Sequence, residues 1–161
     1  MAWVVADLCR GPRATFLTLS EEVTGLAVKN LAWPASLPAS VLHLTGAPLE
    51  LLGVRVEFST TAVVGNRVFS IEFQDLASDL VSLAVPATAV AASTSGAVEF
   101  HPTYRMANSV EPAGTTIRTN LPRGAFIYPG RQITILDQSV IDLSDTLIVH
   151  VRARVRERPS R

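Results

Sequence analysis

The clearest hydrophobic pattern in this chain lies on both sides of Gly65-Asn66, where apolar residues alternate with polar or small ones. A period of two is typical of a strand with one buried face. Glycine at the first turn position accepts the positive φ of a type II′ turn, so the sequence predicts a hairpin that turns at Gly65-Asn66. The positions expected on its buried face are Leu52, Val54, Val56 and Phe58, then Phe69, Ile71 and Phe73.

Further short alternating segments follow, separated by turn residues. Pro129-Gly130 predicts a type II turn, because proline presets φ and glycine takes the positive φ. The expected strands are 79–85, 96–100, 115–121, 125–128, 131–137 and 145–155. In the last of these, Leu147, Val149, Val151, Ala153 and Val155 share one face. About seven or eight strands at this spacing, with no convincing helix, predict an all-β fold, an antiparallel β-sandwich of jelly-roll-like type.

Residues 1–47 differ from the rest of the chain. They contain both tryptophans, Trp3 and Trp33, and frequent prolines, which argue against long regular structure. The stretch 18–31 fits a capped helix, and 26–31 fits a short strand equally well. We therefore expect an N-terminal extended arm over residues 1–47 and a β-sandwich domain over 48–158, with an ordinary first strand and loop as the alternative.

Composition narrows the function classes. The chain has 161 residues and a formal net charge of zero, which suits one domain and excludes a whole-molecule electrostatic binder of nucleic acid. Hydrophobic residues make up 48% and charged residues 17%, which suits either a well-filled core or a surface buried against other subunits. Cys9 is the single cysteine, so no internal disulfide forms. The N-terminus is a poor signal peptide, and no stretch reaches about 18 apolar residues, so we expect synthesis in a cytoplasm and no membrane partner.

No catalytic motif occurs in the sequence. Phosphate-binding glycine loops and a nucleophile elbow are absent. His43, His101 and His150 lie far apart and carry no partnering motif, although a triad assembled in space stays open. We therefore predict no catalytic residues, no cofactor and no enzyme activity.

Two weaker chemical signals concern carboxylates and tyrosines. Asp137, Asp142 and Asp145 bracket one loop and offer oxygen ligands for calcium, but aspartate is also an ordinary turn residue, and we predict no metal. Tyr104 and Tyr128 lie beside prolines, and exposed aromatic rings of this kind bind sugars in some sandwiches. A carbohydrate-binding module is therefore an alternative function.

The C-terminal strand ends in the strongest local charge bias of the chain. Arg152, Arg154 and Arg156 share one face, which is typical of an edge strand that charges keep unpaired. The alternative is a contact with an acidic protein surface or with packaged nucleic acid. On that alternative these arginines are candidate partner-binding residues, together with Trp3 and Trp33 of the arm.

Three segments carry a resemblance to a known family: EFSTTAVVGNRVFSIEF at 57–73, AVAASTSG at 89–96 and FIYPGRQITILDQSVIDLSDTLIVHVRARV at 126–155. The chain resembles small β-sandwich structural proteins of tailed bacteriophage virions, over about residues 50 to 155. The resemblance leans most on the turn at Gly65-Asn66 and on Arg67, and its further features are Pro129-Gly130, Asp137 and the loop from Asp142 to Asp145. It implies a virion component and supplies no catalytic residue.

The leading hypothesis is therefore a capsid decoration or cement protein, present in many copies in the virion. Its expected partners are major capsid or neck and tail proteins, and copies of itself, a trimer being one arrangement. A neck or tail-fibre adaptor, a carbohydrate-binding β-sandwich module and a hydrolase with an unrecognised triad are the alternatives.

Overall fold

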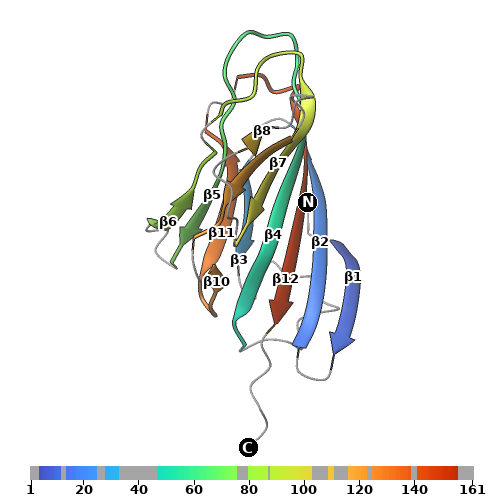
Figure 1. The fold of residues 1–161 in the computed structure, drawn as a ribbon, viewed down its shortest axis with the longest axis vertical. Helices are drawn as coiled ribbons and strands as arrows, with labels where there is room; N and C mark the ends of the chain where they lie inside the picture. Colours follow the sequence, from blue (N-terminus) through green and yellow to red (C-terminus); the bar gives the residue numbers. More distant parts are fainter. Residues whose placement is uncertain are drawn as a thin grey trace, which may run out of the picture.

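The computed structural model describes residues 4–11, 14–24, 28–32, 47–75, 80–86, 88–102, 109–110, 116–122, 125–138 and 141–155. Over these residues the chain forms strands and no helix (Figure 1). The strands are β1 (Val4–Gly11), β2 (Ala14–Thr24), β3 (Val28–Ala32), β4 (Leu49–Ser59), β5 (Phe69–Gln74), β6 (Leu80–Ala84), β7 (Ser95–His101), β8 (Ser109–Val110), β9 (Thr116–Asn120), β10 (Phe126–Ile127), β11 (Gln132–Asp137) and β12 (Thr146–Val155). No helix in this part of the chain is long and apolar enough to cross a membrane.

The strands form two sheets that pack against each other, which confirms the predicted all-β sandwich (Figure 1). The larger sheet has the order β1-β2-β12-β4-β7-β9-β8, and β10 also pairs with β4. The smaller sheet has the order β3-β11-β5-β6. All described pairs are antiparallel except β7 and β9, which run parallel. Phe58 of β4 stacks on Phe69 of β5 with ring centroids 5.4 Å apart, so the core lies between the sheets.

The buried face of β12 is the one that its alternation predicts. Leu147, Val149, Val151, Ala153 and Val155 are each at most 3% exposed. Burying side chains of the size of leucine or valine stabilises a fold by about 1.5–3 kcal/mol each. This strand pairs with β2 on one side and with β4 on the other, so it lies inside the larger sheet.

A β-bulge changes the predicted face of β4. Arg152 pairs with Gly53 and Ala153 pairs with Leu51, which leaves Leu52 without a partner in β12. The extra residue shifts the alternation by one position. The prediction that Leu52 is buried was therefore wrong, and the buried residues of β4 are Leu49, Leu51, Val54, Val56 and Phe58.

The predicted hairpin at Gly65-Asn66 was also wrong. β4 belongs to the larger sheet and β5 to the smaller one, so the segment between them crosses from one sheet to the other. Gly65 does not have the positive φ of a type II′ turn, and a Cβ atom there would lie 2.1 Å from Ile141 Cδ1. The glycine is needed for this close packing, and Asn66 is simply exposed.

The predicted turn at Pro129-Gly130 is confirmed. Gly130 has a φ of 82°, which suits the third position of a type II turn. The N–H of Arg131 donates to the carbonyl of Tyr128 at 2.9 Å and closes the turn.

The described residues between 1 and 47 are strands of the sandwich. β2 pairs with β12 along ten residues, Thr15 to Thr24, and β3 pairs with β11 of the smaller sheet. The position of β3 agrees with the strand alternative for 26–31, not with a helix. Over these residues the region belongs to both sheets, so a boundary at residue 47 does not separate an arm from a domain. Trp3 and Trp33 lie outside the described residues.

Candidate functional site

A buried ion pair closes one end of the sandwich. The side chain of Arg67 is completely buried, and its Nε and Nη2 donate to Oδ2 and Oδ1 of Asp145 at 2.8 and 3.2 Å. Its Nη1 donates to the carbonyls of Val63 and Gly65, both at 3.0 Å. A buried charge is tolerated when it is paired and hydrogen-bonded in this way. Arg67 and Asp145 therefore have a structural role.

The carboxylates of the predicted calcium loop bind protein donors. Asp145 also accepts the Thr61 N–H at 2.7 Å, while Asp142 accepts the Thr61 hydroxyl at 2.6 Å and the Ser144 N–H at 2.9 Å. Burial raises the pKa of Asp145, but hydrogen bonds from Arg67 and Thr61 and the charge of Arg67 outweigh it, so its pKa is lowered. The Thr61 hydroxyl is the main cause of the lowered pKa of Asp142. Both carboxylates are therefore occupied in holding the segment after β4.

A third segment joins the same end. The Thr60 hydroxyl donates to the Ala91 carbonyl at 2.9 Å and accepts the Thr94 N–H at 2.9 Å. The backbones of Arg67 and Val90 exchange two hydrogen bonds, of 2.9 and 2.8 Å. Residues 60–68, 88–94 and 141–145 are thus tied together, and we call this set the loop clamp. Among the described residues no group of three or more His, Cys, Asp or Glu side chains has a metal-binding arrangement, and the Asp137 side chain is not described.

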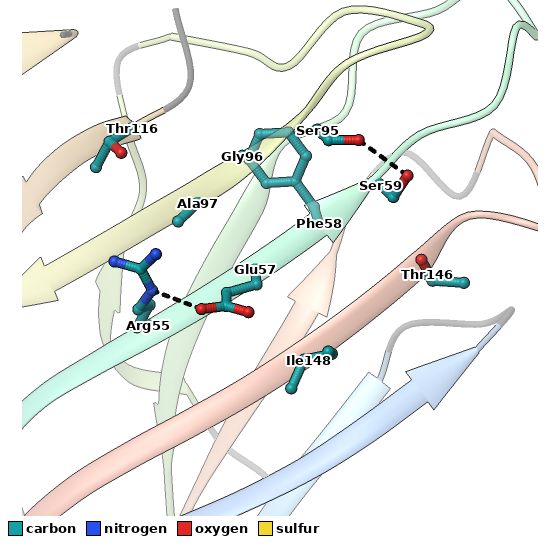
Figure 2. A pocket seen from close by; sticks show the side chains of 10 residues that line it. All are labelled: Arg55, Glu57, Phe58, Ser59, Ser95, Gly96, Ala97, Thr116, Thr146 and Ile148. Carbon is teal, nitrogen blue, oxygen red and sulfur yellow. Dashed lines mark hydrogen bonds and ion pairs between the residues drawn. The ribbon is translucent and has the colours of Figure 1, made fainter.

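The outer face of the larger sheet has a shallow groove of about 410 Å³ over β12, β4, β7 and β9 (Figure 2). Small residues such as Ala97 line the groove. The hydroxyls of Ser59 and Ser95, also in its lining, form a hydrogen bond of 3.0 Å. Arg55 and Glu57 form an ion pair of 3.0 Å at its edge. The lining mixes polar and apolar side chains, and its one aromatic residue, Phe58, is buried.

The charges beside this groove are paired with each other. Glu99 accepts hydrogen bonds from Arg118, at 3.1 Å, and from Arg55. Burial raises the pKa of Glu99, but the hydrogen bonds from Arg118 and Arg55, the charge of Arg55 and a hydrogen bond from His101 together outweigh it and lower the pKa. His101 and His150 lie 3.6 and 3.8 Å from Glu99 and Glu57, and His43 is outside the described residues. These ion pairs bridge neighbouring strands of the larger sheet.

The basic strand differs from its prediction. β12 is paired on both sides, so it is not an edge strand and its arginines do not protect an edge. Arg154 binds Glu50 of β4 at 2.9 and 2.5 Å, whereas Arg152 is exposed on the outer face. Arg156 lies outside the described residues. A partner contact at Arg152 and Arg154 stays a prediction.

The smaller sheet ends in an apolar edge. β6 pairs with β5 alone among the described strands, and Leu80, Val81, Leu83 and the following Val85 are 56%, 53%, 42% and 37% exposed. We call these four residues the β6 edge. Natural proteins usually protect an edge strand with charge, proline or a cover. Between Leu80 and Val85 there is no charged residue, so the unpaired backbone and the exposed apolar side chains coincide.

A second groove, of about 170 Å³, lies next to this edge. Val81, Phe126, Tyr128 and Arg131 are among its lining residues. Tyr128 is 46% exposed, its ring centroid lies 6.0 Å from that of Phe126, and the Arg131 guanidinium lies 5.7 Å from the Tyr128 centroid. Val81 of the β6 edge therefore shares this groove with two aromatic rings. Tyr104 is outside the described residues.

Sequence reasoning missed the two most informative features. Arg67 and Asp145 are 78 residues apart, and the only signal was a lone arginine two residues before the first residue of β5. The β6 edge was predicted as an ordinary strand. Its run of nearly continuous apolar residues was the signal, but such a run usually indicates a buried strand.

Comparisons with known proteins give distant fold similarities. No family model and no curated protein matches the chain. A carbohydrate-binding module from the family 9 glycoside hydrolase Cel9A of Ruminococcus flavefaciens has a TM-score of 0.40 and 13% identity, over 84% of this chain and 95% of that one. The CBM22-1 and GH10 modules of xylanase 10B from Clostridium thermocellum, in complex with xylohexaose, have a TM-score of 0.34 and 11% identity, over 91% and 22%. The agarase AgWH50C has a TM-score of 0.30 and 9% identity, over 99% and 22%. Similarity at this level carries no inference about a ligand or an activity.

Proposed function

We propose that this chain is a non-catalytic structural protein of a tailed-phage virion and that it acts by binding other virion proteins. The observation that carries the proposal is the β6 edge. The resemblance of residues 50 to 155 to virion sandwich proteins supports the same role, and it favours a capsid decoration or cement protein. A neck or tail-fibre adaptor would use the same surface.

The physical argument starts from the backbone. A strand at the end of a sheet offers unpaired N–H and C=O groups, and an added strand satisfies them. The exposed side chains of the β6 edge then lose water, which contributes about 25 cal/mol per Å² of apolar surface. Repeated copies on one particle add avidity, so a modest contact suffices for stable attachment.

The paired charges support a binding role over catalysis. Arg67 is bound to Asp145, Glu99 to Arg118 and Arg55, and Arg154 to Glu50. A general base or nucleophile needs a free electron pair aimed at a substrate. Asp145, Glu99 and Glu50 are thus each engaged with an arginine of the same chain.

The test uses particles that lack this protein. Purified wild-type chain is mixed with them, and the bound fraction is measured by co-sedimentation and located by electron microscopy. We expect wild type and a Val64→Lys control to attach and Leu83→Lys to attach at least ten-fold more weakly, because lysine charges the edge. Val64 is 91% exposed in the loop clamp, so both variants put the same charge on an exposed apolar position. Failure of wild type to attach to any particle component would overturn the proposal.

Carbohydrate binding is the second candidate, and the exposed ring of Tyr128 is the observation that favours it. Gln74 and Gln132 line the same groove, where the Gln132 amide donates to the Gln74 carbonyl oxygen at 2.8 Å. If the chain binds carbohydrate, Tyr128→Ala should abolish binding to the glycans that the wild-type chain binds on an array. If the wild-type chain binds no glycan on the array, the carbohydrate-binding function is wrong.

A further inference from the structure

The β6 edge also fits one particular partner. We infer that β6 pairs antiparallel with β6 of a second copy of this chain, so that the two smaller sheets join into one continuous sheet across a two-fold axis. This inference rests on the proposed role in assembly and names one partner of that surface.

Charge is the first argument for a second copy. A strand with a charge is repelled when an identical strand places a like charge opposite it. From Leu80 to Pro86 the β6 segment has no charge, so two copies meet without repulsion.

The order of side chains is the second argument. In an antiparallel pair of identical strands centred on Ser82, each Leu80 lies opposite Ala84 and each Val81 opposite Leu83. Large apolar residues then meet small or apolar ones along the whole strand. The two Ser82 hydroxyls face each other at the axis, where one donates to the other. Because the same surface is used on both copies, the contact closes as a dimer in which both β6 strands are paired.

The irregularity of β6 is compatible with this register. Ser82 pairs with Phe73 and Leu80 pairs with Gln74, so Val81 is an extra residue without a partner in β5. Its side chain is 53% exposed and lines the groove that contains Tyr128. In the dimer, Leu83 of the second copy lies opposite Val81 and extends the apolar contact toward that groove.

The contact is small for a permanent dimer. Standard interfaces use about 20–30 residues on each side, and the β6 edge supplies four exposed apolar side chains. We therefore expect a dimer that dissociates on dilution in solution and that is reinforced by neighbouring contacts in a particle.

The first experiment is sedimentation velocity of the full chain from low micromolar to several hundred micromolar. Wild type and Val64→Lys should shift from monomer to dimer, and Leu83→Lys should stay monomeric with an unchanged circular dichroism spectrum. Leu83 is 42% exposed, so its substitution leaves the fold intact. A wild-type chain that is monomeric throughout, or a Leu83→Lys dimer as strong as wild type, overturns the inference.

The second experiment tests the register through a disulfide. In a Cys9→Ser background, Ser82→Cys should form a disulfide dimer in air, because opposed residues of an antiparallel pair have Cα atoms about 4.5–5.5 Å apart. Asn66→Cys, at an exposed position of the loop clamp, is the control and should stay reduced. Equal cross-linking of both variants contradicts the register.

The two proposals fail in distinguishable ways. If wild type is monomeric at all concentrations but binds particles, and Leu83→Lys does not, then the β6 edge pairs with a different virion protein and only the dimer is wrong. If wild type neither dimerises nor binds particles, both proposals are wrong.

Discussion

Replacing Asp145 by Asn should lower the free energy of unfolding strongly. The change is nearly isosteric, but it removes the charge that neutralises Arg67, whose side chain is 0% exposed. Asp145 Oδ2 receives Nε at 2.8 Å and Oδ1 receives both Nη2 and the Thr61 N–H. An amide offers one oxygen in place of two, so it also loses at least one of these bonds. Removing one partner of a buried pair costs about 3–5 kcal/mol, because the other charge stays buried without compensation.

That cost is large against the whole stability of a domain, which is about 5–15 kcal/mol. Urea unfolding followed by circular dichroism measures it as a lower midpoint with an unchanged slope. Asp142→Asn is the matched control. Asp142 lies in the same segment and binds Thr61 and Ser144, but it makes no hydrogen bond to Arg67. We expect a clearly smaller loss for this variant.

The double variant Arg67→Met, Asp145→Leu adds a second check. Apolar replacement of both members of a buried pair is often neutral or stabilising, so it should recover much of the loss. The reasoning fails if Asp145→Asn lowers the unfolding free energy by less than about 1 kcal/mol, or by no more than Asp142→Asn does.

Three further predictions concern the pH dependence of stability, the packing at Gly65 and the turn at Gly130. The pKa values of Asp145 and Glu99 are lowered in the folded protein, so both carboxylates contribute to the free energy of unfolding. This contribution is fully present above the unfolded-state carboxyl pKa of about 4, and it is lost as pH falls through the folded-state pKa values. Urea midpoints between pH 2 and 7 should therefore fall on the acid side, and a midpoint that rises below pH 4 contradicts this. Gly65→Ala should cost about 1–3 kcal/mol, because its Cβ would lie 2.1 Å from Ile141 Cδ1, and Ile141→Ala should offset part of the loss in the double variant. Gly130→Ala should cost about 1–2 kcal/mol at its φ of 82°, and a thermal scan that shows no change would contradict the positive φ.

Local alternation predicted much of the fold. β12 and β5 were identified with their buried faces, because each obeys a period of two over its whole length. The turn at Pro129-Gly130 was identified because its residues dictate its dihedral angles. These are properties that a few neighbouring residues determine.

Sheet membership needed long-range information. The alternation in β4 and β5 predicted two strands correctly, but it does not distinguish two strands that pair from two that pack face to face. Phe58 and Phe69 meet across the core, and the segment between the strands is fixed by Asp145 and Val90, far away in sequence. The bulge at Leu52 likewise depends on the partner strand.

The candidate site was beyond the reach of local patterns for the same reason. Leu80 to Val85 has the composition of a buried strand, and only the absence of a neighbour beyond β6 in the described sheet leaves it exposed. The arginines of β12 were given an edge-strand role because the sequence does not show that β2 lies beside them. Exposure at a sheet edge follows from strand order, which the sequence alone left undetermined.

The most direct test of the central claim is a reconstruction of the particle that contains this protein, at a resolution that separates strands. The account predicts a strand from another chain hydrogen-bonded to the outer edge of β6, with Leu83 covered. A reconstruction in which the protein is bound to its neighbours through other surfaces, while the β6 edge faces solvent, would contradict it.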